Sequence, residues 1–141
     1  MLNGIIPTTW QPQLHALLRV IIGLMLLEHG TSKILHFPIN DQMLNGYAQM
    51  GNMATFTGLV ELIGGILITI GAFTRVTAFI LSGYMAVAFW MVHFARSHSI
   101  LPMLNGSETV VFFCFIFLYF AAAGAGPYSV DEWREVLIAP R

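Results

Sequence analysis

Residues 14–38 read LHALLRVIIGLMLLEHGTSKILHFP, and this stretch decides how the rest of the chain is interpreted. It is long and apolar enough to cross a bilayer, which takes about 20 residues. It nevertheless carries Arg19, Glu28, His29 and Lys33. On a helix, Arg19, His29 and Lys33 project within roughly 80° of one another, whereas Glu28 lies about 180° from Arg19. Ionisable groups at membrane depth cost ~2.5–3.5 kcal/mol each, so we expect another part of the protein to receive this polar stripe.

The composition predicts an integral membrane protein. Of the 141 residues, 57% are hydrophobic and 9% are charged, and the mean hydropathy is +0.75. Soluble domains carry about 25% charged residues, so these values lie far outside their range. The length predicts one domain over residues 1–141. The net charge of −1 provides no basic stripe for a nucleic-acid partner, and the single cysteine, Cys114, excludes an intrachain disulfide.

Four apolar stretches predict an all-α membrane protein, a compact bundle of four transmembrane helices. We expect spans over residues 14–35, 53–73, 76–94 and 108–126. The second span carries Glu61 with Gly58 and Gly65 on the same side, and small residues let neighbouring helices approach closely. We also expect these small residues to leave space beside Glu61. Short interfacial helices are predicted after the first span and at the C-terminus.

Two capping boxes are predicted, in which a polar side chain caps a helix and a glutamate three residues later bonds back. Asn105 and Glu108 form the first, at the start of the fourth span. Ser129 and Glu132 form the second, at the start of the C-terminal helix, with Asp131 in its first turn.

The distribution of basic residues predicts the orientation of the chain. Four spans place both termini on one side of the membrane, and Arg75, Arg134 and Arg141 gather on that side. Lys33 and Arg96 lie on the other. Because cytoplasmic loops are enriched in lysine and arginine, we predict a multi-pass protein with cytoplasmic N- and C-termini.

Ionisable groups from all four spans are expected to meet at one depth, in the outer half of the bilayer. At ~1.5 Å rise per residue, His29 lies about 9 Å and Glu61 about 12 Å inside the outer ends of their helices. A lone glutamate at that depth would be protonated or paired, which makes His29 and Lys33 its natural partners. Trp90 and Phe112 are expected to wall this site. The predicted ligand-binding or buried polar cluster comprises His29, Lys33, Glu61, His93, Arg96 and Glu108.

A second group of polar residues is predicted to be structural, and it comprises Arg19, Asn105, Ser129 and Asp131. The alternative to a functional cluster is that each residue has an ordinary role. Lys33, Arg96 and Arg19 would then extend their charges to the headgroups, and Glu108 would only cap a helix. No pattern of metal ligands is recognised, and haem ligation by His29 and His93 is the weaker alternative.

Short motifs follow one another along the chain in a characteristic order. They are EHG at 28–30 with Lys33, VELIGG at 60–65, FTR at 73–75, VHF at 92–94, NGSE at 105–108 and GAG at 124–126 leading to SVD at 129–131. In this order and spacing they resemble the DoxX family of small four-helix membrane proteins, over nearly the whole chain. Glu28 departs from the apolar residue that commonly precedes His-Gly, and its role is left open. The resemblance implies a location in the bacterial inner membrane.

The resemblance implies two classes of function. Members of the family have been linked to sulfur-compound:quinone oxidoreduction, to oxidative- and thiol-stress complexes and to quinone resistance. The first hypothesis is a membrane subunit associated with quinone-linked or thiol/sulfur redox chemistry, whose polar cluster hydrogen-bonds a quinone supplied by the membrane. The chain has no CxxC, flavin or haem-attachment motif, so a redox partner protein would supply electrons. The second is a non-catalytic module that binds a small molecule or lipid or assists assembly of another membrane protein. Catalysis and homo-oligomerisation are left open.

Overall fold

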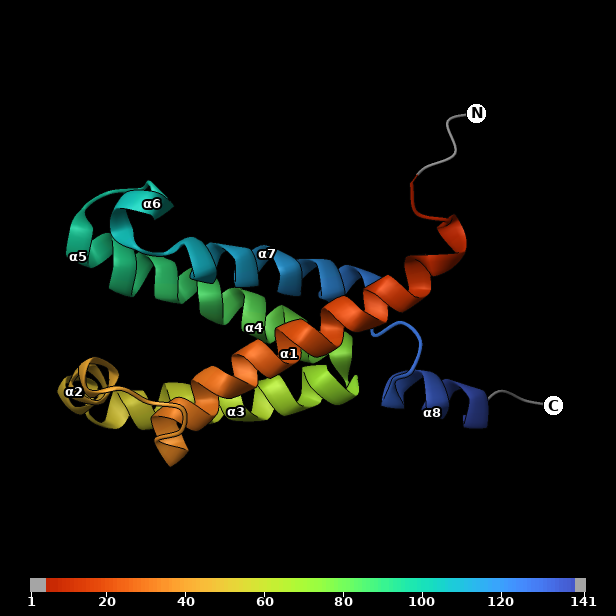
Figure 1. The fold of residues 1–141 in the computed structure, drawn as a ribbon, viewed down its shortest axis with the longest axis horizontal. Coiled ribbons are helices and arrows are strands. Elements are labelled where there is room, and N and C mark those ends of the chain that lie inside the picture. The colour runs from red at the N-terminus through yellow and green to blue at the C-terminus, as the bar shows by residue number, and fades with distance from the viewer. Residues whose placement is uncertain (1–4, 139–141) are drawn as a thin grey trace. The chain divides into compact units, whose positions relative to one another are not determined.

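A computed structural model describes residues 5–138 of the chain. Within that range every regular element is a helix (Figure 1). The helices form two compact units: one contains the chain up to Ala72 and again from Ala125, and the other contains Phe73–Gly124. The single domain expected over residues 1–141 stays a prediction.

The first unit is built on α1 (Gln11–Leu35) and α3 (Asn52–Ile70), which run antiparallel and pack along their lengths (Figure 1). A 3-10 turn, η1 (Thr8–Trp10), precedes α1. The short helices α2 (Asp41–Met50) and α8 (Val130–Ile138) complete the unit. Both short helices have apolar residues on one side and polar residues on the other, and they lie where the sequence predicted short helices.

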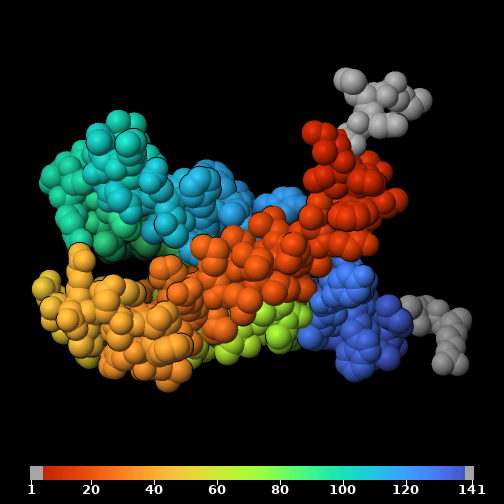
Figure 2. Space-filling model, viewed as in Figure 1, coloured from red at the N-terminus to blue at the C-terminus, as the bar shows by residue number. Residues whose placement is uncertain are grey.

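Glycines on both long helices explain how closely α1 and α3 approach. A Cβ added to Gly65 would lie 2.6 Å from the Leu27 backbone nitrogen, and one added to Gly30 would lie 2.6 Å from the Leu62 Cα. Real Cβ atoms essentially never come within 3.0 Å of such atoms. In the space-filling view the atoms of α1 border those of α3 (Figure 2), as expected for two helices that pack together. The close approach predicted from the small residues of the second span is therefore confirmed.

The second unit pairs one long helical segment with α7 (Glu108–Ala123). The segment consists of α4 (Thr74–Ala88), a π-helical stretch η2 (Phe89–Phe94) and α5 (Ala95–Ser97), and a one-turn helix, α6 (Pro102–Asn105), leads into α7. The Ser82 hydroxyl donates to the Cys114 carbonyl across the pair at 2.9 Å. At the far end Arg75 donates to the carbonyls of Ala121, Ala122 and Ala123, the last carbonyls of α7, which a helix cannot satisfy by itself.

Three helical segments are long and apolar enough to cross a membrane, namely Thr8–Leu35, Asn52–Ile70 and Thr74–Ser97. They correspond to the first three predicted spans and identify a membrane protein. Apolar side chains such as Ile63, Phe79 and Ile80 are exposed on them, as expected for surfaces that face lipid. The fourth predicted span is shorter: α7 begins at Glu108 as expected but ends at Ala123 after 16 residues, or ~24 Å against a hydrocarbon core of ~30 Å.

Only one of the two predicted capping boxes forms. The Ser129 hydroxyl accepts from the Glu132 backbone N–H at 3.1 Å, and the Glu132 carboxylate accepts from the backbone N–H of Tyr128, one residue earlier than in the standard motif. The box at Asn105 and Glu108 was predicted wrongly. Asn105 ends α6, and α7 begins after Ser107 with no side-chain cap. Glu108 is thus the first residue of α7 rather than the third.

Candidate functional site

The packing of α1 against α3 brings Lys33 and Glu61 together. The Lys33 ammonium donates to Glu61 Oε1 at 2.7 Å, and the two side chains are 12% and 7% exposed. This is a short, charge-assisted hydrogen bond between oppositely charged groups, the strong class of such bonds. Lys33 therefore does not extend its charge to the headgroups, which was the alternative for this residue.

The helix contact explains why the lysine reaches inward. A Cβ added to Gly58 would lie 2.8 Å from Lys33 Cβ, so the absence of a side chain there admits the lysine stem. Gly58 and Gly65 do not leave the empty space beside Glu61 that the sequence led us to expect. Lys33, Ile34 and Leu27 of α1 occupy those positions. The expectation was wrong because a small residue in a helix pair admits the neighbouring backbone as readily as a ligand.

His29, the other predicted partner of Glu61, lies one turn before Lys33 on α1. Its side chain is exposed, whereas Lys33 and Glu61 are largely covered. Glu28 is also exposed, on the neighbouring position of the same helix. Of the residues predicted from the first unit, the structure thus establishes direct contact for Lys33 and Glu61.

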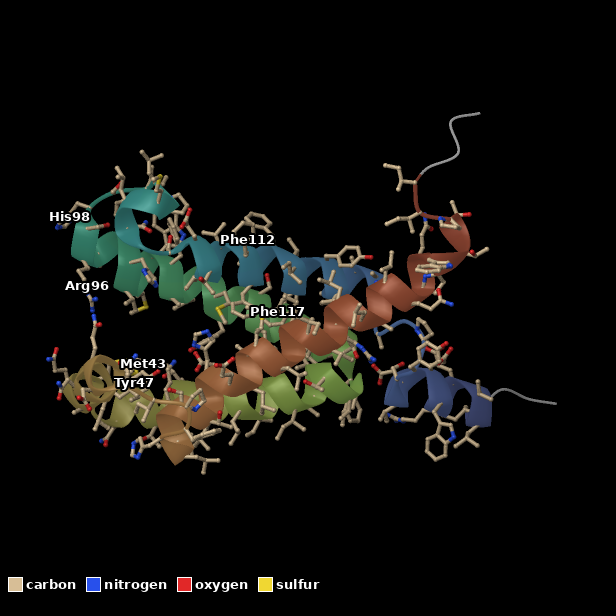
Figure 3. All side chains as sticks on the ribbon, viewed as in Figure 1. Met43, Tyr47, Arg96, His98, Phe112 and Phe117 are labelled. Atoms are coloured by element: carbon tan, nitrogen blue, oxygen red, sulfur yellow. The ribbon has the colours of Figure 1, made fainter. Side chains whose placement is uncertain are left out.

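His93, Arg96 and Glu108, the remaining members of the predicted cluster, belong to the second unit. His93 Nδ1 lies 3.1 Å from the Asn105 carbonyl oxygen. The side chain of Arg96 is exposed (Figure 3). The side chain of Glu108 is exposed as well. Their assembly with Lys33 and Glu61 into one cluster, and the walling of that cluster by Trp90 and Phe112, stay predictions.

Arg19 occupies the opposite end of α1 and is buried, at 1% exposure, rather than extended to the headgroups. Its Nη2 donates to the Tyr128 carbonyl at 2.9 Å. The guanidinium also fills the space above Gly71, where an added Cβ would lie 2.8 Å from Arg19 Cζ and 2.5 Å from Ser129 Cβ. The Asp131 N–H donates to the Gly71 carbonyl at 2.9 Å. These contacts join α1, the end of α3 and the start of α8, and they support a structural role for the polar residues at this end.

The sequence did not single out Ser32, although it makes the link between α1 and α2. Its buried hydroxyl lies 3.1 Å from the hydroxyl of Tyr47, a residue of α2 that Figure 3 labels. Tyr47 was expected only as an apolar position of an interfacial helix. The position of Ser32 beside Lys33, on the covered side of α1, was the available signal. In the part of the chain that the structure describes, no group of three or more His, Cys, Asp or Glu residues is placed to hold a metal ion.

Comparison with known proteins identifies the class. The DoxX family model matches residues 14–94, more than half of the chain. The chain therefore belongs to the DoxX family, as its motifs predicted, and it is a helical membrane protein. An uncharacterized protein of Haemophilus influenzae is 39% identical over 125 residues, which cover 87% of this chain and 92% of the relative. The inner membrane protein YqjF of Escherichia coli is 24% identical over 114 residues, covering 81% and 86% respectively. No solved structure matches the chain significantly.

Proposed function

We propose that this protein is a membrane subunit associated with quinone-linked or thiol/sulfur redox chemistry, and that Lys33 and Glu61 bind the polar head group of a quinone. The observation that carries the proposal is the ion pair itself, a 2.7 Å contact between side chains that are almost covered within an apolar helix pair. Ionisable groups held inside membrane helices are rare and usually functional.

The chemistry of the pair suits a quinone. A lysine ammonium group has three N–H donors, and the contact with Glu61 uses one of them. A quinone carbonyl is an acceptor that such a group can bind. The head group is neutral, and the two opposite charges offset one another, so binding adds no net charge to the membrane interior. The quinone would come from the membrane and electrons from a redox partner protein.

A non-catalytic membrane module is the second candidate function, and one observation favours it. Residues of α1 occupy the space next to Gly58 and Gly65, so the ion pair lies in a closely packed helix contact. A buried polar pair can serve to fix which helices pair and in what register. The protein would then bind a small molecule or lipid elsewhere, or assist assembly of another membrane protein.

Binding of a short-chain quinone to the purified protein tests the proposal. We expect saturable binding to wild type that weakens at least about tenfold, or about 1.4 kcal/mol, in Lys33→Met. Glu28→Gln is the matched control, because it removes a charge from an exposed site of the same helix. Equal binding to all three proteins, or binding to none, would overturn the assignment. Extraction of quinone from the purified protein gives an independent readout.

We further propose a topology: four spans with α7 as the fourth, α2 and α8 in the interface, and both termini in the cytoplasm of the bacterial inner membrane. The location is supported by the Escherichia coli relative, which is an inner membrane protein. Arg75 and Arg134 support the orientation, while Arg141 lies outside the described residues. Single cysteines introduced into a Cys114→Ala background at Gln49 and Glu135 test it with a membrane-impermeant maleimide. Labelling of Gln49→Cys alone in intact spheroplasts is expected; labelling of Glu135→Cys would reject cytoplasmic termini.

A further inference from the structure

The helical segment Thr74–Ser97 changes its hydrogen-bond pattern before it ends. It is α-helical to Ala88 and π-helical over Phe89–Phe94. A π turn adds a residue to the helix and re-aims the side chains that follow, and such turns are frequent at functional sites. His93 lies within this π turn.

A backbone carbonyl fixes the proton on the His93 ring. His93 Nδ1 lies 3.1 Å from the Asn105 carbonyl oxygen. A carbonyl oxygen only accepts, so this contact is a hydrogen bond only when Nδ1 carries the proton. In the neutral ring the lone pair is then on Nε2, which becomes a hydrogen-bond acceptor.

Asn105 is itself held at both ends of its side-chain amide. Nδ2 donates to the Ser99 carbonyl at 2.9 Å, and Oδ1 accepts from the Ser107 backbone N–H at 2.9 Å. These two partners, one an acceptor and one a donor, set the orientation of the amide. The carbonyl that contacts His93 is thereby fixed in place, much as second-layer groups orient the imidazole ligands of metal sites.

Aromatic residues share the π-helical stretch with His93, and one more polar group lies in the turn that follows it. The Trp90 ring makes edge contacts with Phe89 at 5.2 Å and with Phe94 at 5.3 Å between ring centroids. Ser107 is completely buried in the turn that holds Asn105, and its hydroxyl has no hydrogen-bond partner among the described residues. Aromatic and polar side chains are the residue types that bind small apolar ligands carrying one polar function.

We propose that His93 Nε2 accepts a hydrogen bond from a hydroxyl group of a membrane-soluble phenol or hydroquinone, and that Asn105 is the positioning residue that selects, in the neutral ring, the tautomer whose Nε2 is the acceptor. The inference rests on the proposed function, because a hydroquinone is the reduced form of the quinone proposed there. His93 would distinguish the two forms of the ligand. The hydroquinone donates a hydrogen bond to Nε2, whereas the quinone has no O–H group and only accepts.

Two measurements on the purified full-length protein test this inference. Nitrogen-15 NMR of histidine-labelled wild type should show the His93 ring with its proton on Nδ1, and Asn105→Ala should raise the fraction with the proton on Nε2. A short-chain hydroquinone should bind wild type about tenfold more tightly than its dimethyl ether, which cannot donate. That ratio should fall to about one in His93→Phe, but it should be unchanged in His98→Gln, a neighbouring exposed histidine.

The outcomes separate this inference from the proposed function. A neutral His93 ring with its proton on Nε2 in wild type, or equal binding of the hydroquinone and its ether, overturns the role of His93. The proposed function is still supported in that case if quinone binding depends on Lys33. Failure of both quinone and hydroquinone to bind overturns both. The nitrogen-15 spectrum and the comparison of hydroquinone with its dimethyl ether are both made on wild type. They therefore test the role of His93 even if a variant does not fold.

Discussion

Substituting Gly65 by alanine should destabilise the protein through the contact of α1 with α3. The new Cβ would lie 2.6 Å from the Leu27 nitrogen and 2.8 Å from its Cα, where ordinary contact begins at 3.4 Å. Both atoms are backbone, so no side-chain rotation relieves the clash and the helices must separate by about 1 Å. Overpacking of this kind costs ~1–3 kcal/mol. Alanine favours the helix by up to about 1 kcal/mol through its higher propensity, so the middle of that range leaves a net loss of about 1 kcal/mol.

The assay is reversible unfolding of the purified protein in mixed detergent micelles, followed by circular dichroism. Gly83→Ala is the matched control, because Gly83 lies in the interior of α4 and an added Cβ meets nothing within 4 Å. It should leave stability unchanged or raise it by up to about 1 kcal/mol. A Gly65→Ala protein as stable as wild type, or a Gly83→Ala protein that loses as much, would refute the argument from helix separation.

Three further predictions concern polar contacts. In Lys33→Met and Glu61→Leu each single change should cost about 3–5 kcal/mol by removing one partner of a buried ion pair, and the double variant should recover most of that loss; losses that simply add in the same unfolding assay would show that the pair is not coupled. Arg19→Met should speed hydrogen exchange in α8, because it removes the bond to the carbonyl before that helix; unchanged exchange there would contradict the structural role of Arg19. Ser129→Ala should cost about 1 kcal/mol through loss of the N-cap, seen as faster exchange confined to the first turn of α8, and uniform exchange changes would argue against a capping effect.

The helices were predictable because long apolar stretches leave few alternatives in a membrane. The contact of Lys33 with Glu61 also followed from simple reasoning, since an uncompensated glutamate at that depth is unfavourable. The empty space beside Glu61 was not predictable, because a glycine in a sequence does not reveal whether a ligand or a neighbouring helix occupies the vacant position. Only the packing of Leu27 and Lys33 decides this.

The turn before α7 shows a second limit of local patterns. Asn105 can cap a helix or bond to the N–H two residues ahead, and the letters NGSE are compatible with both. The second arrangement is found here, where the other end of the amide also reaches the Ser99 carbonyl. The π turn around His93 likewise has no signature in hydrophobic periodicity, because one inserted residue changes a pattern of apolar residues very little.

The Arg19 contact has a consequence for how the protein is made. Arg19 and the Tyr128 carbonyl that it binds are separated by 109 positions in the chain. Synthesis proceeds from the N-terminus, so α1 enters the membrane long before residue 128 has left the ribosome. During that interval the arginine must be solvated in another way, at the lipid headgroups or by water. Completion of the first unit is therefore a late event in biogenesis, and chains that stop before residue 128 leave their first helix with a cation that the folded protein would have covered.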